Sequence, residues 1–88
     1  MKKHTRIYFD GMGIRILDRF EDMYVPCEWH CNLPAVDINH IYARGMGGSK
    51  TKDYIENLVA MCREHHNDFE AGKIDKEELK EIHLNNIP

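Results

Sequence analysis

Two runs of the sequence decide its fold: Asp37-Ile38-Asn39-His40-Ile41 and Asn57-Leu58-Val59-Ala60-Met61-Cys62-Arg63-Glu64-His65-His66. The first run belongs to a segment rich in β-branched residues, which predicts a strand over residues 35–41. Residues 55–61 are apolar and bounded by polar residues, which predicts a second strand or an extended turn. A helix is expected from about Arg63 to Ala71, because Gly72 suits a helix C-terminus.

The segment before these runs gives a weaker pattern. Thr5 to Phe9 is rich in residues that favour β-structure, and it predicts an N-terminal strand. A glycine-containing turn is expected over residues 10–13. Residues 14–23 fit either a short helix or a strand.

The segment after them carries a helix start signal. Asp75 can be the N-cap of a C-terminal helix, and Glu78 stands at its third position. Ile74 and Leu79 occupy the two positions of a hydrophobic staple. The sequence therefore predicts a small α+β fold. We expect one domain of three parts: an N-terminal extension 1–26, a core 27–72 and a C-terminal helix 73–88.

The small size of the chain limits the stability that its hydrophobic core can supply. A chain of 88 residues buries only about 60–65% of its unfolded surface, so a small domain often needs a metal, a disulfide or a partner. No leader-like apolar run follows Met1, and no stretch approaches the roughly 20 apolar residues of a membrane span. We therefore expect a cytoplasmic protein with no membrane partner. In that compartment cysteines near histidines are typically metal ligands.

Four such residues form two closely spaced pairs, Cys27/Cys31 and Cys62/His65. Zn²⁺ takes four tetrahedral thiolate or imidazole ligands, often in pairs with this spacing. The pattern thus predicts a structural zinc site. His30 competes with Cys31 for the second position, and Cys31 is favoured because a thiolate is the stronger ligand. The alternative is that the cysteines are small apolar core residues.

The same runs also contain a histidine, an asparagine and a paired histidine (His40, Asn57, His65 and His66), and a reaction that one histidine and one divalent cation can carry out is phosphodiester hydrolysis. That reaction needs an activated water and a group that neutralises charge on the phosphate and on the leaving oxygen. A neutral imidazole is a competent base near pH 7, and a divalent cation can carry the second task. Singly, His40 could be a structural histidine and Asn57 a turn or cap residue.

The motifs recur together in order: Cys-x-x-x-Cys at 27–31, Ala-Val-Asp-Ile-x-His-Ile at 35–41, Arg-Gly-x-Gly-Gly at 44–48 and Asn-Leu-Val-x-x-Cys-x-x-His-His at 57–66. This combination resembles the HNH endonucleases, small phage-like members included, over roughly Cys27 to Gly72. The resemblance implies a ββα-metal (His-Me finger) core stapled by zinc. It also implies that His40 is the general base, that Asn57 orients the loop and the base, and that His66 binds the catalytic metal.

Two positions depart from the family pattern. Asn39 stands where an Asp or His usually binds the catalytic metal, and Glu70 stands where some members have a further histidine. Glu70 lies four residues after His66, on the same helix face, and Asp37 is a third acidic candidate. The expected ligand set is thus Asn39, His66, Glu70 and Asp37, and its oxygen content points to Mg²⁺ or Mn²⁺.

The charge pattern bears on partners. The net charge is −3, yet residues 38–63 carry four basic and two acidic side chains. The candidate nucleic-acid contacts are Arg44, Lys50, Lys52 and Arg63, although these could also be a solvated face.

The expected function is a metal-dependent endonuclease acting on DNA. The alternatives are a non-catalytic zinc module that binds nucleic acid or protein, and a nuclease active only within a larger complex such as phage packaging or recombination machinery.

Overall fold

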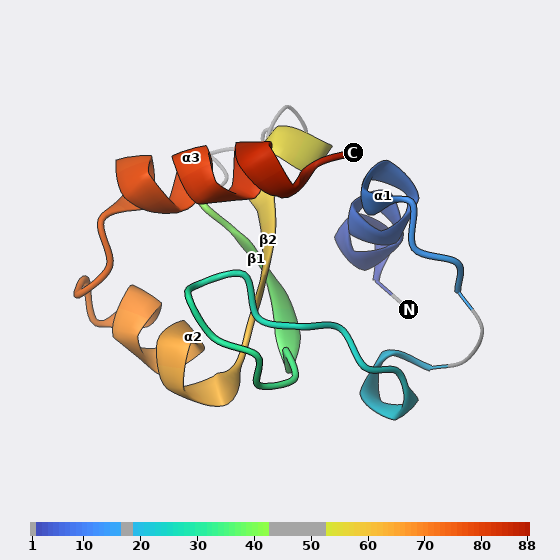
Figure 1. The fold of residues 1–88 in the computed structure, drawn as a ribbon, viewed down its shortest axis with the longest axis horizontal. Coiled ribbons are helices and arrows are strands. Elements are labelled where there is room, and N and C mark those ends of the chain that lie inside the picture. Colours follow the sequence, from blue (N-terminus) through green and yellow to red (C-terminus); the bar gives the residue numbers. More distant parts are fainter. Residues whose placement is uncertain (1, 17–18, 43–52) are drawn as a thin grey trace.

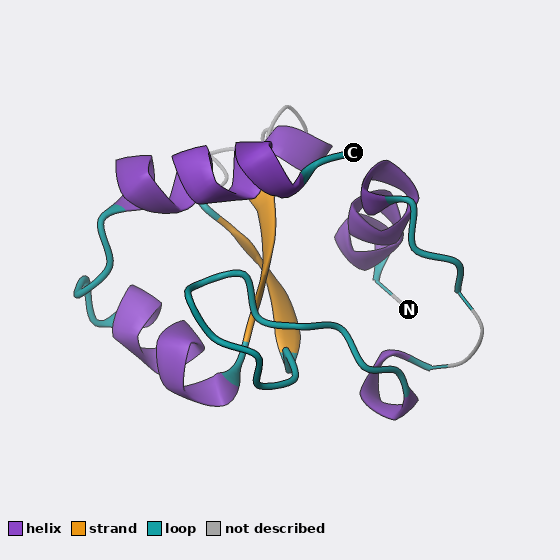
Figure 2. Cartoon of the chain, viewed as in Figure 1, coloured by secondary structure: helices purple, strands orange, loops and turns teal. Residues whose placement is uncertain are grey.

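A two-stranded antiparallel sheet lies at the centre of the computed structural model, with helices around it (Figures 1 and 2). The structure describes residues 2–16, 19–42 and 53–88. The strands are β1 (Asp37–His40) and β2 (Leu58–Met61), and Asn39 pairs with Val59 in their register. Both predicted segments therefore form strands, which pair with each other and are shorter than the sequence indicated.

Helix α2 (Arg63–Glu70) follows β2 after one residue, and it begins and ends close to where the sequence predicts. Its C-terminus closes with two hydrogen bonds, from Gly72 N–H to Phe69 O and from Lys73 N–H to Asp68 O. Gly72 adopts φ 75° there, a left-handed conformation that glycine reaches without a steric penalty.

The C-terminal helix α3 (Lys76–Asn86) is also confirmed. The Asp75 carboxylate accepts a hydrogen bond from Glu77 N–H (3.0 Å), and this caps the first turn. Ile74 and Leu79 are both buried in the same apolar cluster, as the staple requires.

The predicted N-terminal strand is wrong. Residues Lys3–Met12 form helix α1 instead. The physical reason is the spacing of Thr5, Tyr8 and Phe9, which places all three buried side chains on one helical face. Gly13, at φ 71°, ends the helix, so residues 10–12 of the expected turn belong to α1. After it, the described part of 14–23 holds one short 3₁₀ turn, η1 (Phe20–Asp22).

The core consists of two apolar clusters, and β2 contributes to both because its successive side chains point to opposite faces. Leu58 and Ala60 join the first cluster with Phe9 of α1, whereas Val59 and Met61 join the second with Leu79 of α3. The 3₁₀ turn η3 (Ile55–Asn57) precedes β2 and contacts both α1 and α3. Among the residues that the structure describes, no helix is long and apolar enough to cross a membrane.

Candidate functional site

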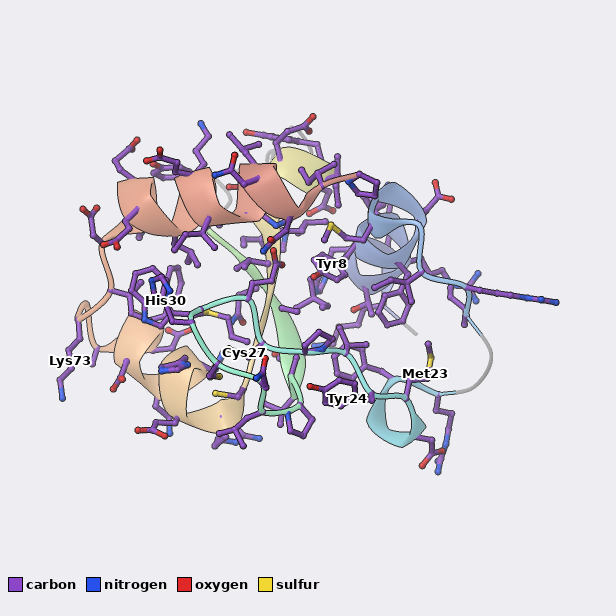
Figure 3. The ribbon with its side chains drawn as sticks, in the orientation of Figure 1. Tyr8, Met23, Tyr24, Cys27, His30 and Lys73 are labelled. Carbon is purple, nitrogen blue, oxygen red and sulfur yellow. The ribbon has the colours of Figure 1, made fainter. Side chains whose placement is uncertain are left out.

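A tight loop over residues 26–34 builds half of the first candidate site. Cys27 N–H donates to Leu33 O (2.9 Å), and Pro26 and Pro34 form an isolated antiparallel bridge at the neck of the loop. His30 adopts φ 52°, so it supplies the left-handed residue of the turn. In Figure 3, Cys27 lies on this loop, close to α2.

Cys27, Cys31, Cys62 and His65 converge, with all four ligand atoms within 4.8 Å of one another. His65 Nδ1 lies 3.5 Å from each of the three sulfur atoms, and the Sγ atoms of Cys31 and Cys62 are 3.9 Å apart. Tetrahedral zinc with Zn–S bonds of about 2.3 Å and a Zn–N bond of about 2.05 Å separates N from S by about 3.5 Å and S from S by about 3.8 Å. The cluster could therefore bind a structural zinc.

His30 lies outside this cluster. Its side chain is 63% exposed, and its Nε2 is 3.9 Å from the Glu78 carboxylate of α3. Of the two candidates for the second position, the structure thus brings Cys31 to the other ligands. Burial raises the pKa of the Cys27 thiol to about 12, so a cation bound there must displace the thiol proton.

The second candidate site is a cleft of about 350 Å³ between β1, α2 and the start of α1, and its lining includes Asp37, Asn39, His40, His66 and Glu70. His66 Nδ1–H donates to Asn39 Oδ1 (3.0 Å), which leaves His66 Nε2 on the side of Glu70, 3.9 Å from its Oε1. One cation with bonds of about 2.1 Å can reach both Nε2 and Oε1, because two such bonds span about 4.2 Å. Asp37 Oδ1 instead accepts from the backbone N–H of Ile38 (2.8 Å).

Asn39 is the most constrained residue of this cleft. It is 8% exposed, and its Nδ2 has no hydrogen-bond partner in the part of the chain that the structure describes. A buried amide group without a hydrogen-bond partner costs about 1–3 kcal/mol of stability, so a reason other than stability accounts for its position.

These donors do not form a complete metal cage. Within the described ranges, the three cysteines with His65 are the one group of at least three His, Cys, Asp or Glu ligands close enough to share an ion. The cleft offers two or three nitrogen and oxygen donors, which is the open set of a cation that also binds substrate and water.

His40, the last residue of β1, lies on the same cleft. Its Nε2–H donates to Asp53 Oδ1 over 2.6 Å, and the two side chains are 19% and 8% exposed. An ionised carboxylate can only accept, so this bond places the proton of a neutral His40 on Nε2 and the lone pair on Nδ1. Sequence reasoning missed Asp53, because a lone acid 13 residues after His40 has no periodic relation to it.

Asn57 holds the chain just after His40. It is 1% exposed; its Oδ1 accepts from Tyr42 N–H (2.9 Å), its Nδ2 donates to Tyr42 O (3.0 Å), and its backbone carbonyl accepts from Ile41 N–H (2.8 Å). These three bonds fix the path by which the chain leaves β1. The side chain therefore orients backbone, and through it the end of the strand that carries His40.

The predicted nucleic-acid contacts are placed only in part. Arg63 begins α2 and is exposed. Arg44, Lys50 and Lys52 lie outside the described residues.

A buried charged network was not expected from the sequence. Glu28 accepts hydrogen bonds from His83 Nδ1–H of α3 (2.8 Å), Tyr8 O–H of α1 (2.7 Å) and Ala60 N–H of β2 (3.1 Å). Figure 3 shows Tyr8 pointing from α1 towards the middle of the molecule. Glu28 thus ties the loop of the zinc cluster to two helices and a strand.

Comparison with known proteins gives one partial likeness. A protein named uncharacterized protein YdfU, from Escherichia coli K12, is 35% identical over 49 residues, which is 56% of this chain. The chain spans 14% of that protein's length. No protein-family model and no solved structure matches. The comparisons therefore assign no family.

Proposed function

We propose that the chain is a metal-dependent endonuclease of the HNH, ββα-metal type, which hydrolyses phosphodiester bonds of DNA. The observation that carries this proposal is the cleft that both His40 and His66 line. Two antiparallel strands and a following helix bring them together from separate parts of the chain, with Asp53 on one and Asn39 on the other. A structural zinc on the cysteine cluster would hold the loop 26–34 against the start of α2.

In the proposed reaction His40 is the general base. Asp53 accepts the hydrogen bond from Nε2–H, so Nδ1 carries the lone pair that takes a proton from a water as the water oxygen attacks phosphorus. The bond from phosphorus to the leaving oxygen breaks, and that oxygen takes a proton from solvent. Asp53 stabilises the imidazolium that His40 becomes.

The second half of the cleft is proposed to hold the cation. His66 Nε2 and Glu70 would supply its ligands, with Asp37 at the edge of the set, and Asn39 would orient the His66 ring through its bond to Nδ1. When bound, a divalent cation neutralises charge on the phosphate and on the leaving oxygen. Asn57 contributes indirectly, because it holds the backbone that follows His40.

The test is a plasmid-nicking assay of the zinc-loaded chain at low salt, with Mg²⁺, Mn²⁺, Ni²⁺ and additional Zn²⁺ in separate reactions. Conversion of supercoiled plasmid to open circles with Mg²⁺ or Mn²⁺ supports the proposal. The neutral amide of Asn39 favours the second candidate, a zinc module that binds without cutting. Binding of a DNA duplex in a mobility-shift assay, with no cleavage under any of the four metals, would establish that candidate instead.

A further inference from the structure

Helix α1 brings a histidine to the proposed active site from outside the ββα unit. His4, in the first turn of α1, lines the cleft with Lys2. Its ring centroid lies 4.9 Å from that of His40, at an interplanar angle of 46°. Its Nε2–H donates to the backbone carbonyl of Ile38 (3.1 Å), two residues before His40 on β1.

The position of His4 is fixed by the way α1 packs. Tyr8 and Phe9 are 1% and 0% exposed, so the helix is anchored in the first core cluster. Gly11 faces η3 so closely that a Cβ atom there would lie 2.5 Å from Ile55 Cγ1. The Tyr8 hydroxyl adds its bond to Glu28. Because the helix is held at several points, its first turn keeps His4 against β1.

Two neighbours therefore constrain the His40 ring. Asp53 holds Nε2 by a hydrogen bond, and the His4 ring lies close beside the His40 ring at a distance typical of paired rings. Burial and the nearby His40 lower the pKa of His4. A neutral His4 has one N–H, which donates to Ile38 O, so its ring lies beside His40 without placing a second positive charge there.

We propose that His4 is a positioning residue for His40 in phosphodiester hydrolysis, an inference that rests on the proposed function. The ring contact restricts the orientation of the His40 imidazole and so keeps Nδ1 directed at the attacking water. A loss of alignment of about 1 Å can cost about 100-fold in rate, so a side chain that touches no substrate can still set kcat.

The bond from His4 to Ile38 has a separate, structural effect. It satisfies a backbone carbonyl of β1, and this stabilises the sheet whatever the reaction. Two substitutions separate the roles. His4→Phe keeps a ring beside His40 and loses the N–H donor, whereas His4→Gln keeps a donor able to reach Ile38 O and loses the ring.

The experiment measures kcat, KM and the thermal midpoint for zinc-loaded wild type, His4→Gln, His4→Phe and His4→Ala. Positioning predicts that His4→Gln and His4→Ala lose about 10-fold or more in kcat at similar KM, and that His4→Phe recovers most of that loss despite a lower midpoint. Asp75→Ala is the matched control, because it removes the N-cap of α3 and so lowers the thermal midpoint away from the cleft and from α1. Its kcat should equal that of wild type.

Two results would overturn the inference: kcat values that follow the thermal midpoint across all variants, or full kcat in His4→Gln. NMR three-bond couplings that report the His40 χ1 angle give a readout independent of cleavage. The contact predicts one dominant rotamer in wild type and averaging in His4→Gln. If wild type does not cut DNA, the proposed function fails by itself. In that case unchanged His40 couplings in His4→Gln would reject the contact role, and altered couplings would support it.

Discussion

At the scale of single residues, the hydrogen bond between His40 and Asp53 determines which nitrogen of His40 can act as the proposed base. A histidine alone can carry its proton on either nitrogen, but a carboxylate 2.6 Å from Nε2 selects one form. The lone pair then belongs to Nδ1. The proposed base is thus defined by a residue that no sequence motif marks.

Asp53→Asn tests that assignment. The amide can donate to Nε2, so the proton of His40 moves to Nδ1 and the base is lost. We expect kcat for nicking to fall by about 100-fold or more, with the zinc content unchanged. Nitrogen-15 shifts of the His40 ring should change from the Nε2–H to the Nδ1–H pattern; a variant that keeps both wild-type shifts and wild-type kcat contradicts the role of Asp53.

His66→Ala addresses the cation half of the cleft. It removes the one imidazole of the proposed ligand set and leaves His65 in place. We expect Mn²⁺ affinity, measured by calorimetry, to fall by about 10-fold or more, and zinc to stay at the wild-type level. The matched control is His30→Ala, which removes an exposed histidine from outside the cleft. If both variants bind Mn²⁺ equally, His66 is not a ligand.

At the same scale, the spacing of residues in the sequence could predict some members of the two sites but not others. The four cluster residues could be found because zinc ligands come in short pairs, and Cys31 could be preferred to His30 on ligand strength. Asn57 could be named from its place in the motif. Asp53 could not be found, because the segment between it and His40 has no periodic pattern from which to infer that the two side chains meet.

At the scale of elements, α1 shows where sequence reasoning failed. The run Thr5 to Phe9 contains residues that favour strands, yet Thr5, Tyr8 and Phe9 also have helical spacing. Tertiary packing decided between the two patterns, because the helix can bury Tyr8 and Phe9 together against the sheet. The elements with an end signal of their own, α2 at Gly72 and α3 at Asp75, could be predicted.

A buried ion pair between His83 and Glu28 attaches helix α3 to the rest of the molecule, and it leads to a prediction about stability. His83 is fully buried; its Nδ1–H donates to Glu28 and its Nε2–H to Ile55 O (2.6 Å), so both nitrogens carry protons. Burial acts to lower the pKa of His83, but the bond to Glu28 and the charges of Glu28 and Glu56 outweigh it and raise the pKa. Tyr8 also faces the pair, through its bond to Glu28.

The sign of the pH effect follows from that raised pKa. While Glu28 stays ionised, the protonated His83 contributes its full stability below the unfolded histidine pKa of about 6.5, and the contribution is lost as pH rises through the higher folded value. His83→Ala should lose about 3–5 kcal/mol near pH 6, because it leaves Glu28 buried without its cation. Urea unfolding of zinc-loaded protein between pH 6 and 9 checks this: a wild-type minus variant difference that does not shrink with rising pH contradicts the ion pair.

At the scale of the whole molecule, a chain of 88 residues is organised around two sites on either side of the start of α2. His65 and His66 are adjacent, and successive helical residues point about 100° apart. His65 accordingly faces the sulfur atoms while His66 faces Asn39. A structural ion on one side would therefore hold the proposed chemistry on the other in place.

Zinc removal tests this organisation. Metal binding to such clusters supplies about 10–16 kcal/mol of apparent free energy in small domains, so a strong chelator should lower the thermal midpoint and reduce the helical circular dichroism signal. Cys62→Ser should behave in the same way without chelator. A purified chain that holds no zinc, with an unfolding transition indifferent to the chelator, contradicts a structural metal.

The central claim is that His40 activates the water that cuts a phosphodiester bond. The most direct measurement is the initial rate of supercoiled plasmid nicking with Mn²⁺ by zinc-loaded His40→Ala beside wild type and the control His30→Ala, at matched zinc content and thermal midpoint. We expect His40→Ala to lose about 100-fold to 10,000-fold in rate and His30→Ala to cut like wild type. Equal rates for His40→Ala and wild type would contradict it.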